Sequence, residues 1–407
     1  MKIDDIRLEI INDSRGQNTL ETTIKAGEFE AFASVPSGKS TGAAEAAVLP
    51  PDLALKKIPW LLLQLKGHQF ASLEQFDSLL IALDGTSDKS NLGGNLMLAL
   101  SMAFARILAK IGNMELFEFL AKISGTKELK LPFCFFNLIE GGVHVDSTLS
   151  EVEGLPFNLP FQEYLLIPQT NSPKKSLGTV RKAIDLLREK VQGKYGSADQ
   201  GDEGGFSLPS NDPQEGFRVL QEVINENSLN GKIGLDAAAS TFYQNGSYNI
   251  GGKIMSRDDL VSFYQLLPNN YQLLSLEDVF DQEDWDGFSK IMQLIGNKVW
   301  IIGDDLLTTN ISRIKKAQEI NAANAIIIKP NQIGTITETI QAANLAKSFG
   351  WKIIVSHRSG ETMDSFIADL AVGLGADGLK SGCPLQKERL VKYERLVEIE
   401  KKSKLKN

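Results

Sequence analysis

The sequence is poor in cysteine, and this shortage excludes the classes of protein that cysteine supports. Only two cysteines occur among 407 residues. Cys134 and Cys383 lie far apart, with no spacing typical of a disulfide framework or a zinc site. We therefore interpret both as reduced packing residues, as expected in a cytosolic enzyme.

An excess of basic charge and a long apolar run are also lacking. Acidic residues outnumber basic ones by 51 to 43, so the net charge is −8. This argues against a general nucleic-acid or anionic-membrane binder, although a local basic pocket could bind a small anionic substrate. The first ten residues do not resemble a signal peptide, and the apolar run at 58–65 is too short to span a bilayer. We expect a cytoplasmic protein without a membrane span.

The length and the order of patterns predict two domains, because a single core rarely serves 407 residues. Strand-like segments are followed by apolar residues at helical spacing in residues 93–111, which indicates a small α+β domain over residues 1–125. A second domain is expected over residues 130–400. The expected strands of the first domain are 6–11, 18–24 and 28–35.

Short β-rich runs recur in the second domain, and each is followed by a helical segment. Apolar strands buried on both faces are typical of a parallel sheet, and this many βα units predict a closed (β/α)8 TIM-like barrel. An Asn-Gly pair at Asn245 and Gly246 predicts a hairpin turn. The runs end at Asp236, Glu277, Asp304, Lys329, His357 and Lys380.

Each run ends in a charged or ionisable residue, and the carboxyl ends of barrel strands form the active-site face. Asp236, Glu277 and Asp304 would converge there, and three carboxylates repel one another unless a cation lies between them. Oxygen ligands without a His or Cys cluster favour Mg²⁺. The alternative is three ordinary surface carboxylates.

Two of the runs end in lysine. Near a metal and a second cation, a lysine can have its pKa lowered until it acts as a general base, and we expect this of Lys329. The alternative, a strand-end lysine that extends to solvent, is common for one such residue. It is less common for Lys329 and Lys380 together at one barrel mouth.

Short motifs follow one another along nearly the whole chain. They are DSRG (13–16), PSGKSTG (36–42), LDGTSDKSNLGGN (83–95), Gln162-Glu163, GDEGGF (201–206), GLDAAAS, SLEDVFDQEDW, GDDLLTTN, IKPNQIGT, SHRSGET and GLKSGCP. One motif alone is weak evidence, but the ordered series resembles the enolase (phosphopyruvate hydratase) family. The resemblance implies an α+β domain followed by an enolase-type barrel, and dehydration of 2-phospho-D-glycerate to phosphoenolpyruvate in glycolysis and gluconeogenesis.

The resemblance also implies a role for each candidate residue. Lys329 would be the general base and Glu203 the general acid, assisted by Glu163, in a superfamily scheme that uses Mg²⁺ and a Lys or His base. Asp236, Glu277 and Asp304 would hold a first Mg²⁺, and Ser40, in a mobile loop, would help to hold a second. The residues expected to bind substrate are His144, Glu163, His357, Arg358, Ser359 and Lys380.

The letters GKST at residues 38–41 also resemble the end of a phosphate-binding P-loop. That motif requires a glycine five residues before Gly38, where this chain has Ala33. The sequence therefore disfavours an NTPase.

Several positions depart from the enolase pattern. Lys39 replaces Ala, Glu140 replaces Asn and Val279 replaces Pro, while Gln386-Lys387 replace Arg-Ser. The segment between His144 and Glu163 is longer by roughly ten residues, a length that a loop tolerates entropically, and the stretch after Glu45 is shorter.

These departures leave two other interpretations open. One is a superfamily enzyme that acts on another acid. The other is an enolase-fold binding or scaffold protein, although every matched catalytic and metal residue keeps its type. By resemblance we expect a homodimer.

Overall fold

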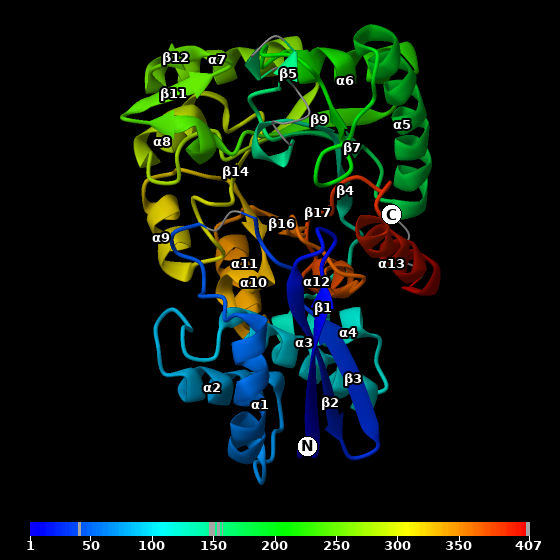
Figure 1. Cartoon of the computed structure of the whole chain (residues 1–407), viewed down its shortest axis with the longest axis vertical. Coiled ribbons are helices and arrows are strands. Elements are labelled where there is room, and N and C mark those ends of the chain that lie inside the picture. The colour runs from blue at the N-terminus through cyan, green and yellow to red at the C-terminus, as the bar shows by residue number, and fades with distance from the viewer. Residues whose placement is uncertain (40–41, 146–150, 153–154, 157, 404–407) are drawn as a thin grey trace.

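The N-terminal part of the chain forms a small sheet covered by helices. The computed structural model describes residues 1–39, 42–145, 151–152, 155–156 and 158–403. Three antiparallel strands pair in the order β1-β2-β3, and helices follow them in sequence, so the predicted α+β fold is confirmed (Figure 1). The elements are β1 (Asp5–Asn12), β2 (Asn18–Ala26), β3 (Phe29–Ser34), α1 (Pro51–Leu65), α2 (Leu73–Asp84), α3 (Gly94–Ile111) and α4 (Leu116–Ser124).

Helix α3 is the most apolar helix of this part. Its 18 residues have a mean hydropathy of 1.4, which by length and composition alone would suit a membrane span. In the structure 78% of the helix is buried, and it packs against β2 and β3. Its apolar residues therefore belong to the core of the sheet domain.

The second part is a closed barrel. Eight strands of the described residues lie side by side, and the pairing of the last with the first closes the ring. The predicted TIM-like barrel is confirmed. Its strands are β4 (Phe133–Glu140), β7 (Glu163–Pro168), β9 (Gly231–Asp236), β13 (Leu273–Glu277), β14 (Trp300–Gly303), β15 (Ala325–Ile328), β16 (Lys352–Ser356) and β17 (Gly378–Lys380).

One barrel strand corrects the expectation of an all-parallel sheet. Strand β7 runs antiparallel to both neighbours, β4 and β9. A parallel neighbour requires a crossover, usually a helix, whereas the described part of the β4–β7 connection contains only the one-turn 3-10 helix η1 (Gly142–His144) and the short strands β5 (Glu151–Val152) and β6 (Leu155–Pro156). The connection therefore returns the chain in the opposite direction.

Helices surround the barrel (Figure 1). They are α5 (Pro173–Tyr195), α6 (Glu215–Glu226), α7 (Arg257–Asn270), α8 (Trp285–Ile295), α9 (Ile311–Glu319), α10 (Pro330–Ile333), α11 (Ile336–Ser348), α12 (Phe366–Gly373) and α13 (Lys387–Ser403). The smaller elements are β8 (Phe206–Ser207), η3 (Ala239–Phe242), β10 (Tyr243–Gln244), β11 (Ser247–Ile250) and β12 (Lys253–Met255). The predicted hairpin is confirmed, because β10 and β11 pair across Asn245 and Gly246, whose φ angles are 50° and 82°.

The barrel interior is apolar below its mouth. Side chains from alternate strand positions form a buried cluster of Phe135, Leu165, Ile167, Leu274, Ile302, Ala325, Ile327 and Ile354. This packed layer closes the floor of the barrel and leaves only the carboxyl ends of the parallel strands for a polar site. The division at Ser124–Lys130 stays a prediction, and that segment lies between the end of α4 and the start of β4.

Candidate active site

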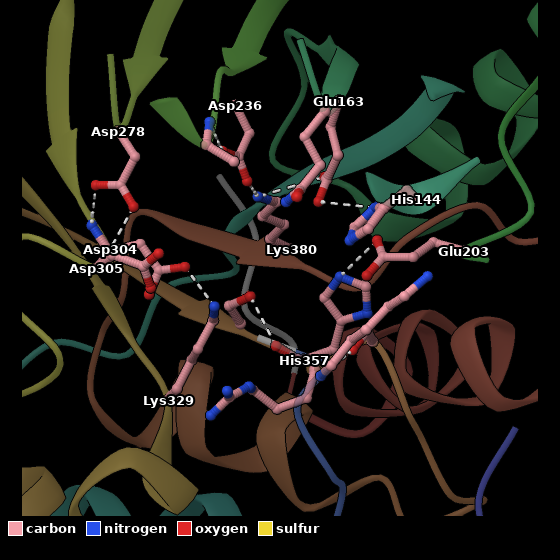
Figure 2. A pocket seen from close by; sticks show the side chains of 16 residues that line it. His144, Glu163, Glu203, Asp236, Asp278, Asp304, Asp305, Lys329, His357 and Lys380 are labelled. Carbon is pink, nitrogen blue, oxygen red and sulfur yellow. Dashed lines mark hydrogen bonds and ion pairs between the residues drawn. The ribbon is translucent and has the colours of Figure 1, made fainter. Parts of the chain in front are cut away.

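A polar pocket lies at the mouth of the barrel. Its volume is about 490 Å³, open solvent at the mouth included. The predicted residues that line it are His144, Glu163, Glu203, Asp236, Asp304, Lys329, His357, Arg358, Ser359 and Lys380 (Figure 2). Glu277 is buried beside it, and Ser40 lies outside the described residues.

Strand register places three carboxylates around one lysine. Asp236 pairs with Glu277 on one side and with Glu163 on the other. Lys380 Nζ lies 2.7 Å from Asp236 Oδ2, 2.9 Å from Glu277 Oε1 and 3.3 Å from Glu163 Oε2. Burial lowers the pKa of Lys380, but these carboxylates outweigh it and hold that pKa well above its usual value. Lys380 is therefore a permanent cation.

The acidic residues exceed the cations that neutralise them, which fits a divalent ion. Within the described part of the chain, Glu277 Oε2 is buried without a hydrogen-bond partner. Burial and the neighbouring Asp236 raise the pKa of Glu277 well above its usual value. Carboxylate oxygens in such a setting suit a hard cation, so these residues fit the expected metal.

The predicted metal ligands are divided between two groups in this structure. Asp236 and Glu277 meet at Lys380, whereas oxygens of Asp304, Asp278 and Asp305 lie within 4.8 Å of one another. Asp278 accepts hydrogen bonds from the backbone N–H groups of Asp304 (2.9 Å) and Asp305 (2.7 Å). Asp278 and Asp305 were not among the residues predicted from the sequence. Each directly follows a predicted metal ligand, in the motifs SLED and GDD, and this adjacency is the sequence signal that could have identified them.

Lys329 lies in a different electrostatic setting from the one expected. Its ammonium forms a very short ion pair with the Asp304 carboxylate. Burial lowers the pKa of Lys329, but Asp304 outweighs burial, so the pKa lies above its usual value. The expected lowering is wrong for this arrangement, because the nearest group is an anion. A cation that engaged Asp304 would weaken this ion pair and lower the pKa of Lys329, and so make its neutral form available as a base.

Glu203, His357 and the pair His144 and Glu163 form the opposite wall. His357 Nε2 lies 3.2 Å from Glu203 Oε2, and His144 Nδ1 lies 3.9 Å from Glu163 Oε1. Despite burial, the two imidazoles hold the pKa of Glu203 well below its usual value. Burial instead raises the pKa of Glu163 well above its usual value. The pKa values of the two carboxyl groups are thus shifted in opposite directions, upward for Glu163 and downward for Glu203.

Glu140, one of the departures, supports the loop that carries Glu203. Its buried carboxylate accepts hydrogen bonds from the N–H groups of Glu203 (3.1 Å) and Gly205 (2.5 Å). Its Oε2 also lies 3.8 Å from His144 Nδ1. Glu140 therefore holds the backbone of residues 203–205 through these two hydrogen bonds.

Two other departures, Lys39 and Gln386, also contact this loop. Lys39 Nζ donates to Asp202 Oδ2 (2.6 Å) and to Val143 O (2.8 Å), so its charge is paired at the rim. The Gln386 amide donates to Asp202 O at 3.0 Å, which gives it a contact beside the site. The insertion before Glu163 lies largely outside the described residues.

Arg358 is held in the wall next to the rim. Its guanidinium donates to Glu45 Oε2 and to Asn331 Oδ1, each at 2.8 Å. Ser359 Oγ accepts from the Lys39 N–H at 2.8 Å and from Arg15 Nη1 at 3.3 Å. Cations and hydroxyl donors thus gather on one side of the pocket, as an anion would require.

Comparison with known proteins agrees with this architecture. The family model described as "Enolase, N-terminal domain" matches residues 3–120, and that described as "Enolase, C-terminal TIM barrel domain" matches residues 128–405. Enolase B of Dictyostelium discoideum is 39% identical, with 98% of this chain and 95% of the relative covered. The enolase of Methanopyrus kandleri is 37% identical over the same shares. The chain therefore belongs to the enolase family and is a hydro-lyase of the phosphopyruvate hydratase type.

Proposed function

We propose that this chain removes water from 2-phospho-D-glycerate to give phosphoenolpyruvate, reversibly, in glycolysis and gluconeogenesis. The observation that carries the proposal is the placement of acid and base groups. Figure 2 shows Lys329 on one side of the pocket and Glu203 with His357 on the other. A substrate between them has a proton acceptor on one face and a proton donor on the other, as elimination of water requires.

Lys329 is the proposed base. The hydrogen that it removes is bonded to the carbon next to the substrate carboxylate, and the electron pair left behind moves toward that carboxylate. Neutral Lys329 Nζ can take this proton. The neutral form requires that the ion pair with Asp304 first be weakened, because that pair favours the ammonium.

Glu203 and Glu163 are the proposed acid pair. The C–O bond to the hydroxyl group breaks as that group receives a proton and leaves as water. Glu163 keeps a proton in the buried wall, while Glu203 lies in contact with His357 and in the same cluster as His144. We propose that Glu163 assists Glu203 by passing it this proton within the shared cluster, and that Glu203 then delivers the proton to the departing hydroxyl group.

Mg²⁺ is the proposed cofactor, with two ions per site. Asp236, Glu277 and Asp304 would hold the first, and Ser40, outside the described residues, is proposed for the second. When bound, the metal supplies positive charge that stabilises the developing negative charge on the substrate carboxylate. Lys380 adds a fixed positive charge from the protein.

Arg358 and Ser359 are proposed to bind the substrate phosphate, with His144, His357 and Lys380 contacting the rest of the substrate. The rigid, bidentate guanidinium of Arg358 suits phosphate oxygens. Its bonds to Glu45 and Asn331 fix its orientation before substrate arrives. This reduces the ordering that binding would otherwise require.

Ultraviolet detection of phosphoenolpyruvate tests the proposed reaction. With 2-phosphoglycerate and Mg²⁺ we expect absorbance to rise; chelator should stop the rise, and excess Mg²⁺ should restore it. The chelator arm serves as the control for metal-independent absorbance. Folded, Mg²⁺-loaded protein that forms no product would contradict the proposal and favour another acid substrate or a binding role.

We also propose that the chain is a homodimer of the cytoplasm. The proposal rests on the enolase family membership. Light scattering is expected to give twice the mass of one chain at micromolar concentration. A monomer mass that does not change with concentration would contradict the dimer.

A further inference from the structure

Arg389 of helix α13 is a buried cation behind the wall that carries His357. Its side chain belongs to the fully buried group. Its guanidinium donates to the backbone oxygens of Arg358 (2.5 Å) and Ser359 (2.6 Å) and to Gln386 Oε1 (3.2 Å). These contacts tie α13 to the loop that carries Arg358 and Ser359, the residues proposed to bind the substrate phosphate. The sequence analysis did not single out Arg389.

One further contact of Arg389 determines which ring nitrogen of His357 carries the proton. Arg389 Nη1 lies 2.7 Å from His357 Nδ1. A guanidinium has five N–H donors and no acceptor. His357 Nδ1 must therefore accept this hydrogen bond. If Nδ1 carried a proton, two N–H groups would point at each other and neither would have an acceptor. The ring proton is left on Nε2, the nitrogen that faces Glu203.

The other ring nitrogen completes the chain of contacts. His357 Nε2 lies 3.2 Å from Glu203 Oε2, and Asn137 Nδ2 donates to the same oxygen at 3.3 Å. With the proton on Nε2, the imidazole becomes a second donor to this carboxylate oxygen. With the proton on Nδ1, a lone pair would instead face an ionised carboxylate, which is repulsive.

We propose that Arg389 is a positioning residue that holds His357 as the neutral Nε2–H tautomer and so directs a hydrogen-bond donor at Glu203. The contacts of Arg389 with His357 do not depend on the proposed function. The expected effect on turnover does, because it rests on the proposed role of Glu203. Arg389 does not line the pocket. Because it lies behind His357, it would not contact the substrate either. It acts through the imidazole.

The packing and the charge around His357 support this assignment. Gly382, at φ 67°, lies against both side chains: an added Cβ would come within 3.0 Å of Arg389 Cδ and 3.1 Å of His357 Cε1. Only glycine leaves the two side chains in contact there. Burial, with Arg389 as a further cause, lowers the pKa of His357 to about 4, which agrees with a neutral ring.

The chain is well suited to a direct test, because it contains only three histidines. A long-range ¹H–¹⁵N spectrum of histidine-labelled protein, recorded in chelator without substrate, reports which nitrogen of each ring carries a proton. The signal lost in His357→Asn assigns His357. We expect the wild-type ring to carry its proton on Nε2. A proton on Nδ1 would overturn the proposal without any variant.

Variants of helix α13 test whether Arg389 is the cause of the His357 tautomer. Arg389→Gln should shift the His357 proton toward Nδ1 and lower kcat by about 10- to 100-fold, by analogy with the groups that orient metal-bound imidazoles. Arg389→Lys, which keeps a cationic donor, should keep the Nε2–H tautomer. Arg395→Gln is the matched control, because Arg395 lies on the same helix but pairs with Asp369 and Glu115. It should leave the His357 signal unchanged.

The two readouts separate this inference from the proposed function. An Arg389→Gln spectrum identical to that of the wild type overturns the role of Arg389, whatever the activity. If Arg389→Gln does not fold, the wild-type and Arg389→Lys spectra decide, and a proton on Nδ1 in either of them overturns the role. Because the spectra need no substrate, a wild type that makes no phosphoenolpyruvate counts against the proposed reaction alone.

Discussion

Replacing Lys329 with alanine is expected to lower kcat by about 10²- to 10⁴-fold, the usual contribution of a general base. The variant loses the only proposed proton acceptor on its side of the pocket. The groups proposed to bind the phosphate, Arg358 and Ser359, keep their own partners in the wall. Mg²⁺-dependent substrate binding, measured by calorimetry, should therefore change far less than turnover.

Lys352→Ala is the control for this experiment. Lys352 begins the neighbouring strand β16, at the opposite end of the barrel from the pocket, and its side chain is 44% exposed. Its replacement should leave kcat unchanged. A Lys329→Ala variant with turnover close to that of the wild type would refute Lys329 as the base.

The largest effect on stability is expected from Lys380→Met. Methionine nearly conserves the side-chain volume but removes the one cation, among the residues that the structure describes, that contacts Asp236, Glu277 and Glu163, all of which are buried. Removing one member of a buried ion pair costs about 3–5 kcal/mol, because the remaining charge has no compensation. We expect a loss of this size in the free energy of unfolding.

Urea unfolding in chelator measures this loss, with Lys352→Met as control. The partly exposed Lys352–Asp377 pair, at 3.3 Å, should contribute less than the buried Lys380 cluster, about 1 kcal/mol. Addition of Mg²⁺ should narrow the gap in the free energy of unfolding between Lys380→Met and the wild type, because an ion bound by the folded carboxylates replaces part of the positive charge that only the variant has lost. Equal losses in the two variants would show that Lys380 is not the central counter-ion.

The sequence predicted well those features that depend on local periodicity. The apolar runs that end at Asp236, Glu277 and Lys380 are strands β9, β13 and β17 of the barrel. Their terminal residues lie at one mouth because parallel strands end at the same edge. The barrel fold and the position of the pocket at its mouth can therefore be predicted from the spacing of apolar runs and of the ionisable residues that end them.

Features that depend on contacts between distant segments were not predictable in this way. Strand β7 was missed because no regular βα interval marks it. The pKa of Lys329 was predicted in the wrong direction, since a sequence pattern does not reveal that Asp304 is its nearest partner. Arg389 has no local signal either, because its role depends on a contact with His357 from a different element.

The reversed direction of β7 has a consequence for how this barrel can change. Because β4 ends and β7 begins at the mouth, with Glu140 opposite Glu163, the connection between them starts and finishes at the rim of the pocket. Its length can vary without shifting the register of any barrel strand. This makes the connection a natural graft point: segments of other lengths could be exchanged there between relatives while the barrel itself stays intact.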